Sequence, residues 1–290
     1  MHLLLPLLAS LLFVCGLIFI KRAGAAGVGP WTITFLANQS AMLAFSSLWF
    51  WGGPGQPWSC LWQPAIIAWL YIQGLVFTFL AIGRGDVSVA TPVFGLKVIL
   101  VAFLLATMGG ESLPRSVWYA CLLATLGIGL IQWTGQGKRR NVAFTVLLAL
   151  GAASSYASFD VLVQRWAPAW GAGRFLPLVY WMVGLLSLGL VPWVQWSKLR
   201  EPAVLALLVP GALLIALQAV CIVVTLSVFG DAARVNVVYA LRGLWAVVLA
   251  WAASKIWGGS EALLGPKAWL TRLLGAGFLT AAVILALRPA

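Results

Sequence analysis

Three charged side chains inside apolar stretches are the residues best placed to do chemistry. Lys97 and Arg242 each fall about nine positions into a long apolar run, and Asp160 lies toward the end of another. A Lys or Arg at the bilayer centre costs about 2.5 to 3.5 kcal/mol on insertion scales, so each should face a wet cavity or a partner. Each is therefore a candidate for ligand binding. The alternative is a structural pairing with a carboxylate or with helix-end carbonyls.

Charge balance favours an anionic ligand. Asp160 is the single acidic residue within the predicted spans, so it can neutralise at most one of the two cations. If both cations line one cavity, a carboxylate or phosphate on the substrate is the natural counter-ion. Arg242 would give it bidentate hydrogen bonds and Lys97 a point charge. We expect an amino-acid-like or other anionic or zwitterionic small molecule. Proton exchange at Lys97 or Asp160 is a further hypothesis.

Helical spacing adds neighbours to these charges. Positions i, i+3 and i+6 place Asn236, Tyr239 and Arg242 on one stripe, and the same spacing gives Thr91, Phe94 and Lys97. Two glutamines and one tryptophan complete the candidate substrate-binding set: Gln73, Gln218 and Trp245. The alternative roles are hydrogen bonding between helices for the glutamines and filling of the helix bundle for the tryptophan.

Two other residue types bear on the same helices. Pro92 removes a backbone hydrogen bond and predicts a local break in its helix, and Pro210 predicts a similar kink. Asp86 and Asp231 fall just before the helices that carry the two cations. A carboxylate there is expected to cap free amides at the positive end of the helix dipole.

The composition identifies the environment of these helices. Of the 290 residues, 63% are hydrophobic and 8% are charged, and the mean hydropathy is +1.03. A soluble domain carries about 25% charged residues. This deficit of polar surface excludes a water-soluble globule and indicates a polytopic helical membrane protein.

Apolar runs bounded by Gly, Pro and charge predict ten transmembrane helices. They lie near residues 3–20, 32–51, 64–83, 88–108, 116–134, 142–163, 175–196, 203–229, 233–254 and 268–287. Five spans precede the basic segment at 135–141, and five follow it.

An offset of 145 relates the two halves of the chain. At this offset Gln73 aligns with Gln218, Phe94 with Tyr239, and Lys97 with Arg242. We expect residues 1–137 and 138–290 to be two repeats within one integrated membrane domain. Because each repeat has an odd number of spans, the second enters the membrane from the opposite face. Inverted repeats of this kind recur in secondary transporters, which bind substrate near the midplane.

The cations outside the span centres indicate orientation. Loops after odd-numbered spans, together with Arg272, hold eleven Lys and Arg residues, whereas the termini and the other loops hold five. The positive-inside rule therefore places both termini outside.

Several functional classes lack support in the sequence. The formal charge of +12 is spread between apolar runs instead of covering one solvated face, so we expect no nucleic-acid partner. The four cysteines are far apart and His2 is the only histidine, so neither a metal nor another cofactor is expected. No nucleotide-binding, zinc-protease or Ser/His/Asp signature indicates an enzyme.

Several short motifs resemble those of a known family. They are Gly16 to Lys21 and Gly29-Pro30 near the start, Gly85-Asp86 and Gly230-Asp231, Gly110-Glu111 and Ser260-Glu261, and the glycine pairs Gly127/Gly129 and Gly275/Gly277. Across essentially the whole chain, this pattern resembles the EamA-type ten-helix members of the drug/metabolite transporter superfamily. The resemblance implies inverted five-helix repeats, a central cavity lined largely by helices four and nine, and movement of small metabolites. It also implies cytoplasmic termini, opposite to the charge count. Arg242 departs from the apolar, Pro-containing run that is usual in the family at this point.

Taken together, the sequence predicts a secondary transporter of small organic solutes in the inner (plasma) membrane, working by alternating access, with export favoured over import. We expect a substrate with a carboxylate or phosphate, contact with membrane lipid, and a monomer or homodimer. A membrane-embedded lipid-processing enzyme and a channel or non-transporting scaffold stay open as alternatives.

Overall fold

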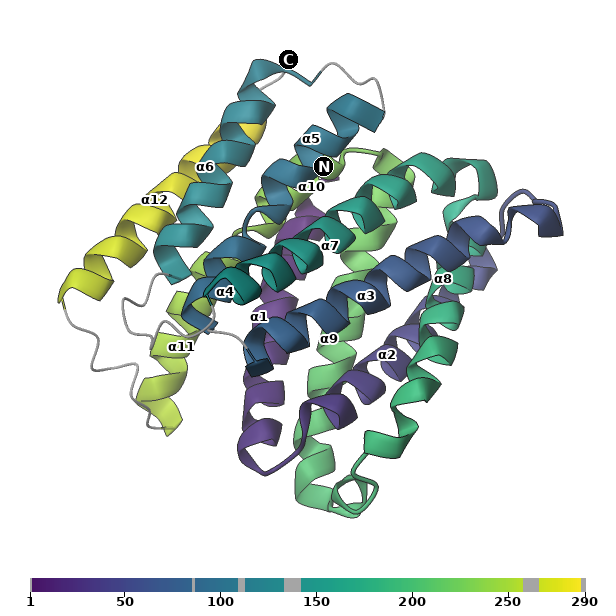
Figure 1. The fold of residues 1–290 in the computed structure, drawn as a ribbon, viewed down its shortest axis with the longest axis horizontal. Helices are drawn as coiled ribbons and strands as arrows, with labels where there is room; N and C mark the ends of the chain where they lie inside the picture. The colour runs from purple at the N-terminus through teal and green to yellow at the C-terminus, as the bar shows by residue number, and fades with distance from the viewer. Residues whose placement is uncertain (1, 85–86, 109–112, 133–141, 258–265, 288–290) are drawn as a thin grey trace. The chain divides into compact units, whose positions relative to one another are not determined.

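The computed structural model describes residues 2–84, 87–108, 113–132, 142–257 and 266–287, and these contain helices and no strands (Figure 1). The α-helices are α1 (Leu4–Ala25), α2 (Pro30–Ser46), α3 (Trp62–Arg84), α4 (Val87–Phe94), α5 (Lys97–Met108), α6 (Arg115–Gln132), α7 (Val142–Trp170), α8 (Ala172–Ser187), α9 (Pro202–Phe229), α10 (Ala232–Tyr239), α11 (Arg242–Trp257) and α12 (Pro266–Leu287). Short 3₁₀ helices are η1 (Ser47–Trp51), η2 (Trp58–Cys60), η3 (Leu188–Trp193) and η4 (Lys198–Arg200).

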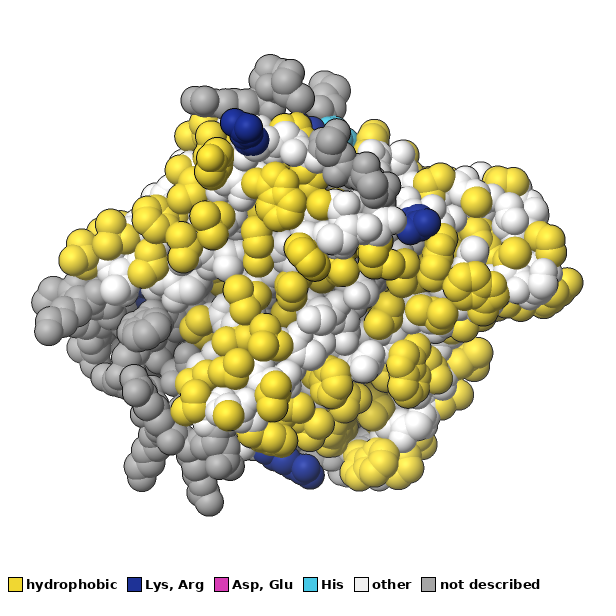
Figure 2. Space-filling view, turned by 45° about the horizontal axis from the view of Figure 1, so that its top comes forward, with side chains coloured by type: hydrophobic (Ala, Val, Ile, Leu, Met, Phe, Trp, Pro, Cys, Tyr) yellow, Lys and Arg dark blue, Asp and Glu magenta, His cyan; other side chains and the backbone are white. Residues whose placement is uncertain are grey.

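Eight stretches of the described chain are helices long and apolar enough to cross a membrane. They are Leu4–Ala25, Trp58–Ile82, Val89–Met108, Val142–Trp170, Ala172–Trp193, Pro202–Phe229, Ala232–Leu249 and Leu270–Leu287. The apolar helix over Arg115–Ile131 is shorter. Hydrophobic side chains also cover most of the face in Figure 2, where Lys and Arg occur at isolated points. The chain is therefore an all-α protein with several membrane-spanning helices.

The helices differ from the predicted spans at four places. The predicted span at 32–51 is α-helical only to Ser46 and ends as the 3₁₀ helix η1. The span at 175–196 changes to the 3₁₀ helix η3, which contains Pro192. The spans at 88–108 and 233–254 are each broken into two helices. In contrast, α9 runs unbroken through Pro210, so the kink predicted there does not end the helix.

One compact unit consists of residues 1–72 and 163–230. In it α1 packs along α9, where Gly16 lies against Ile215 and the backbone of Gly211. Helix α2 packs against α8 and α9. The buried side chain of Asn38 joins two of these helices, because its Nδ2 donates a hydrogen bond of 2.8 Å to Ser187 Oγ.

The other compact unit consists of residues 73–162 and 231–290. Within it α6 packs along α12, and α10 contacts α5, α6 and α12. The α6–α12 approach is closest at two glycines: a Cβ added to Gly127 would lie 2.9 Å from the carbonyl oxygen of Gly275. Both broken helices and most of α7 belong to this unit, so it positions the candidate site.

Candidate functional site

Two helices of the second unit break immediately before the two candidate cations. Helix α4 ends at Phe94 and α5 begins at Lys97, while α10 ends at Tyr239 and α11 begins at Arg242. At the offset of 145 found in the sequence, the end of α4 corresponds to the end of α10, and the start of α5 corresponds to the start of α11. The structure therefore places Lys97 and Arg242 each in the first turn of a new helix, not in the middle of a continuous one as the sequence predicted.

The backbone at both breaks is held by hydrogen bonds that span three residues. The amide of Gly95 donates to the carbonyl of Pro92 at 3.0 Å, and that of Leu96 donates to the carbonyl of Val93 at 3.0 Å. At the second break the amide of Leu241 donates to the carbonyl of Val238 at 3.1 Å. Such bonds tighten the chain into a 3₁₀-like turn between one helix and the next. Pro92 lies inside α4, and the bond that it cannot donate would go to the Ser88 carbonyl, so the missing donor alone does not explain a break that follows Phe94. The second break contains no proline.

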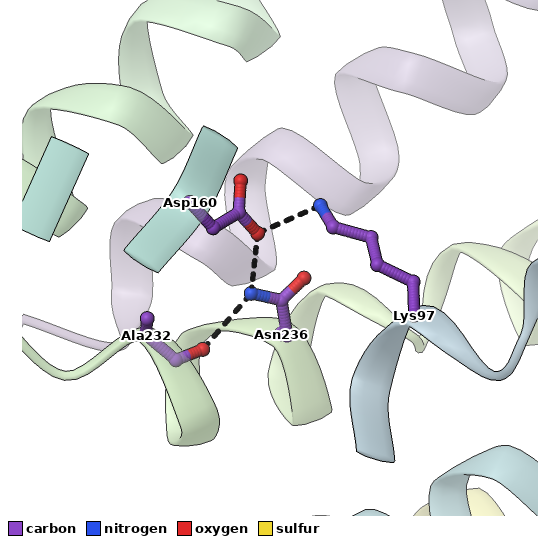
Figure 3. Close-up of polar contacts among 4 residues, drawn as sticks. All are labelled: Lys97, Asp160, Ala232 and Asn236. Atoms are coloured by element: carbon purple, nitrogen blue, oxygen red, sulfur yellow. Dashed lines mark hydrogen bonds and ion pairs between the residues drawn. The ribbon is translucent and has the colours of Figure 1, made fainter. Parts of the chain in front are cut away.

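The first cation forms an ion pair with the buried carboxylate of α7. Lys97 Nζ lies 2.7 Å from Asp160 Oδ2, with the two side chains 17% and 3% exposed (Figure 3). A buried carboxylate needs such a partner because removal from water disfavours its charge. Lys97 therefore takes the structural pairing that the sequence left open as an alternative. In this conformation its charge is already balanced inside the protein.

A third helix completes this arrangement. Asn236 of α10 is buried, and its Nδ2 donates to the same Asp160 Oδ2 at 2.7 Å and to the Ala232 carbonyl at 2.9 Å (Figure 3). Lys97, Asp160 and Asn236, hereafter the charge cluster, thus join α5, α7 and α10 through a single carboxylate oxygen. The Ala232 carbonyl is a contact that sequence reasoning missed, although its position four residues before Asn236 on a helix would have indicated it.

The second cation lies over an aromatic ring. The guanidinium carbon of Arg242 is 4.5 Å from the centroid of the Tyr239 ring, and Tyr239 is buried. This distance is within the range of a cation-π interaction. A guanidinium is planar and has several N–H groups in one plane, which is the geometry that binds a carboxylate or phosphate through two hydrogen bonds.

The remaining predicted site residues fall into two groups. In the second unit, Phe94 packs with Val93 against buried alanines of α3, α4 and α7, and Thr91, Gln73 and Trp245 are half-buried on α4, α3 and α11. Gln218 belongs to the first unit, on α9, where it is half-buried. The structure thus joins Lys97, Asp160 and Asn236 directly and stacks Arg242 on Tyr239.

The prediction that the side chain of Asp231 caps its helix is wrong. Asp231 is the N-cap residue of α10, but its carboxylate makes no capping hydrogen bond. Its Oδ2 instead lies 3.3 Å from Nη1 of Arg234, one turn along the same helix. Because Arg234 follows Asp231 by three positions, the two side chains lie on one face of the helix, and this spacing in the sequence would have indicated the pair. Asp86, the other predicted cap, lies outside the described residues.

Metal binding has no candidate site in the described part of the chain, where no three His, Cys, Asp or Glu side chains group together. Comparison with known proteins gives no match to any family model and none to any curated protein. One solved structure, described only as the crystal structure of a protein, is similar over 98% of this chain and 97% of its own. Its TM-score is 0.70 and its sequence identity is 17%, so the likeness shows the fold alone.

Proposed function

We propose that this protein is a secondary transporter of small organic solutes that carry a carboxylate or phosphate. The observation that carries the proposal is the arrangement of the second unit. Two helices break at equivalent positions, and each break presents a cation. Discontinuous helices at substrate sites recur in secondary transporters, because the exposed backbone and helix ends can bind ions there.

The charges favour an anionic group on the solute. Lys97, Asp160 and Arg242 have formal charges that sum to +1, and Asp160 is the single acid that the sequence places within a span. A substrate carboxylate or phosphate at Arg242 would offset this charge and receive paired hydrogen bonds from the guanidinium. A solute that is zwitterionic would meet the same requirement with its carboxylate.

The wider architecture of the proposal follows from the offset of 145. We propose ten spans arranged as two inverted five-helix repeats, with α4–α5 in the first equivalent to α10–α11 in the second. The equal lengths of α4 and α10, eight residues each, support this pairing. The resemblance to EamA-type drug/metabolite transporters supports an inner-membrane carrier that alternates access without ATP hydrolysis.

The test begins with a metabolite screen by thermal stabilisation of the purified protein, since a compound that binds the folded state raises the apparent melting temperature. We expect organic anions and zwitterions to rank highest. Counterflow of the leading compound in proteoliposomes should then saturate. A ranking led by cationic compounds would contradict the anion site, appearance of a chemically altered product would indicate an enzyme, and unsaturable flux would indicate a channel.

A further inference from the structure

Exposed aromatic side chains gather at one end of the first compact unit, where residues 47–63 and 166–173 meet. Phe50 is 93% exposed and Trp58 is 87% exposed. Neither segment contains a charged residue. We call these two segments the aromatic end. Large apolar side chains exposed in this way mark a surface for a membrane or for a partner.

The two segments of the aromatic end are held together by direct contacts. Gln56 Nε2 donates a hydrogen bond of 2.6 Å to the Ala169 carbonyl, and Trp170 Nε1 donates one of 2.8 Å to Gln63 Oε1. Gly53 lies against the carbonyl of Trp170, where a side chain would not fit. Figure 1 shows the α2–α3 connection and the α7–α8 turn beside each other at this end of the unit. The rings therefore belong to one surface, formed where α2, α3, α7 and α8 meet their connections.

Helix lengths indicate the depth of the aromatic end. The other end of α2 is held at a charged connection before α9, because the Gly29 amide donates to Gln195 Oε1 at 2.7 Å. In this connection Lys198 forms an ion pair with Glu201. From there the 17 residues of α2 cover about 25 Å and the 5 residues of η1 cover about 10 Å more. The hydrocarbon core is about 30 Å thick, so a chain that crosses it from the charged connection leaves it within η1.

Helix α3 gives the same depth from its own sequence. The stretch of this helix that is long and apolar enough to cross a membrane begins at Trp58, in η2, and ends at Ile82. Both ends of the α2–α3 connection therefore reach the boundary between the hydrocarbon core and the headgroups. The exposed rings of Trp51, at the end of η1, and Trp62, at the start of α3, flank this connection.

The chemistry of the aromatic end is suited to the headgroup layer. Trp is favoured at this boundary because its ring is apolar and its indole N–H can donate a hydrogen bond. Arg174, exposed in the first turn of α8, follows the α7–α8 turn and supplies a guanidinium that can bind a lipid phosphate. Glu201 is the one acidic residue in the sequence of this unit, and it pairs with Lys198 at the other end. Apolar rings beside a cation, with no carboxylate, complement a phospholipid surface.

We propose that the aromatic end is seated in the headgroup layer of the bilayer, with Phe50, Trp51, Trp58 and Trp62 against the ends of the acyl chains nearest the headgroups. Phospholipid is then the partner of this surface, and the α2–α3 connection is not a loop in water. The inference goes beyond the proposed function. It needs only that α2 and α3 cross the membrane, so it can fail while solute transport is confirmed.

The accessibility of a spin label measures this depth. The full chain, with its four native cysteines replaced by alanine, carries a nitroxide through Trp58→Cys, Leu217→Cys or Arg200→Cys in vesicles of phosphatidylcholine and phosphatidylglycerol. Collisions with oxygen report hydrocarbon, and collisions with a water-soluble nickel chelate report water. Leu217, exposed in the middle of α9, is the hydrocarbon reference, and Arg200, before α9, is the aqueous reference. We expect the oxygen-to-nickel ratio at position 58 to lie between the two references and to exceed that at position 200 several-fold.

Two variants at Phe50 test whether the rings hold this position. Phe50→Glu places a charge at the boundary and should lower the ratio measured through Trp58→Cys toward the aqueous reference. Phe50→Leu is the matched control, because it stays apolar and should leave the ratio unchanged. Since Phe50 is 93% exposed, both variants should melt in detergent like the unmodified protein. A label at Trp51→Cys repeats the measurement and guards against misfolding of Trp58→Cys.

The other possible results overturn the inference, each in a different way. A ratio at position 58 equal to the aqueous reference would place the connection in water. A ratio equal to that at position 217 would place it in the hydrocarbon core. Few collisions with either reagent would show that a second copy of the chain covers the rings. An unchanged ratio in Phe50→Glu would show that this ring does not lie at the boundary.

Discussion

At the scale of single residues, the proposed binding of an anionic solute depends most on Arg242. Its guanidinium carbon lies 4.5 Å from the centroid of the Tyr239 ring. Arg242→Gln should abolish saturable uptake, because loss of one partner of a desolvated charged pair costs about 2 to 5 kcal/mol. Arg242→Lys is the control that keeps the charge but not the paired hydrogen bonds, and it should retain part of the affinity. The measurement is counterflow in proteoliposomes, with folding checked by thermal melting. Unchanged transport by Arg242→Gln would remove the anion site.

A second prediction at this scale separates the structural and transport roles of the Lys97–Asp160 pair. Lys97→Met alone leaves a buried carboxylate without its cation and should destabilise the fold by about 3 to 5 kcal/mol. Adding Asp160→Leu removes the orphaned charge, so the double variant should recover most of that stability. Thermal melting of the single and double variants measures the interaction free energy between Lys97 and Asp160. If Lys97 also contacts solute, uptake stays lost in the stable double variant, whereas restored uptake would show that the pair is purely structural.

The sequence could identify the charged residues but not their pairing. Lys97, Arg242 and Asp160 stand out because charges inside apolar helices are costly. Lys97 and Asp160 are 63 positions apart, and the charge count showed only that one cation could be neutralised, without indicating which one. The pairing depends on how α5 and α7 pack, which no local pattern encodes. The contact from Asn236 was missed for the same reason.

At the scale of helices, hydrophobic runs predicted ten spans because lipid requires about 20 apolar residues per crossing, and eight stretches of the described chain are helices long and apolar enough to cross a membrane. Pro92 predicted a break in this helix, but α4 continues past Pro92 to Phe94, and the break between Tyr239 and Arg242 has no proline beside it. The spans that end early as η1 and η3 show the same limit. A 3₁₀ turn keeps the apolar composition and changes only the hydrogen bonding, so hydropathy cannot detect it.

Close contact between α6 and α12 leads to a prediction about glycine. A Cβ on Gly127 would lie 2.9 Å from the Gly275 carbonyl oxygen, and one on Gly275 would lie 2.7 Å from the Gly127 carbonyl oxygen. Gly127→Ala or Gly275→Ala must therefore push the helices apart, and we expect a loss of about 1 to 3 kcal/mol. Matched controls are Gly129→Ala and Gly277→Ala on the same helices, where an added Cβ has no atom within 4 Å.

These controls should be neutral or slightly stabilising, because Ala is about 0.5 to 1 kcal/mol better than Gly within a helix. Thermal melting of the purified variants in detergent measures the difference. If all four substitutions change the melting temperature equally, helix propensity and not close packing would explain the result, and the described α6–α12 contact would lack energetic weight.

At the scale of the whole molecule, composition was sufficient to predict a helical membrane protein, because so few charged residues cannot cover the surface of a water-soluble protein. Composition could not predict which helices pack together. The sequence halves 1–137 and 138–290 describe a proposed repeat, whereas each compact unit combines segments from both halves. Contacts such as that of α1 with α9 join helices far apart in the chain, and apolar faces of this kind fit many partners equally well.

Orientation in the membrane is the property of the whole molecule on which the cation distribution makes a clear prediction. Loops after odd-numbered spans, together with Arg272, hold eleven Lys and Arg residues, and the termini and the other loops hold five; Lys138, Arg139 and Arg140 form the densest group. Because such residues are retained in the cytoplasm, both termini should lie outside. In a variant without the four native cysteines, Ala290→Cys should react with a membrane-impermeant maleimide added to intact cells. Gln136→Cys, beside the basic group, should react only after lysis. The reverse pattern would give the cytoplasmic termini that the family resemblance implies.

Replacing Lys138, Arg139 and Arg140 with Gln tests whether these charges determine the orientation. If they do, the labelling of Ala290→Cys in intact cells should fall.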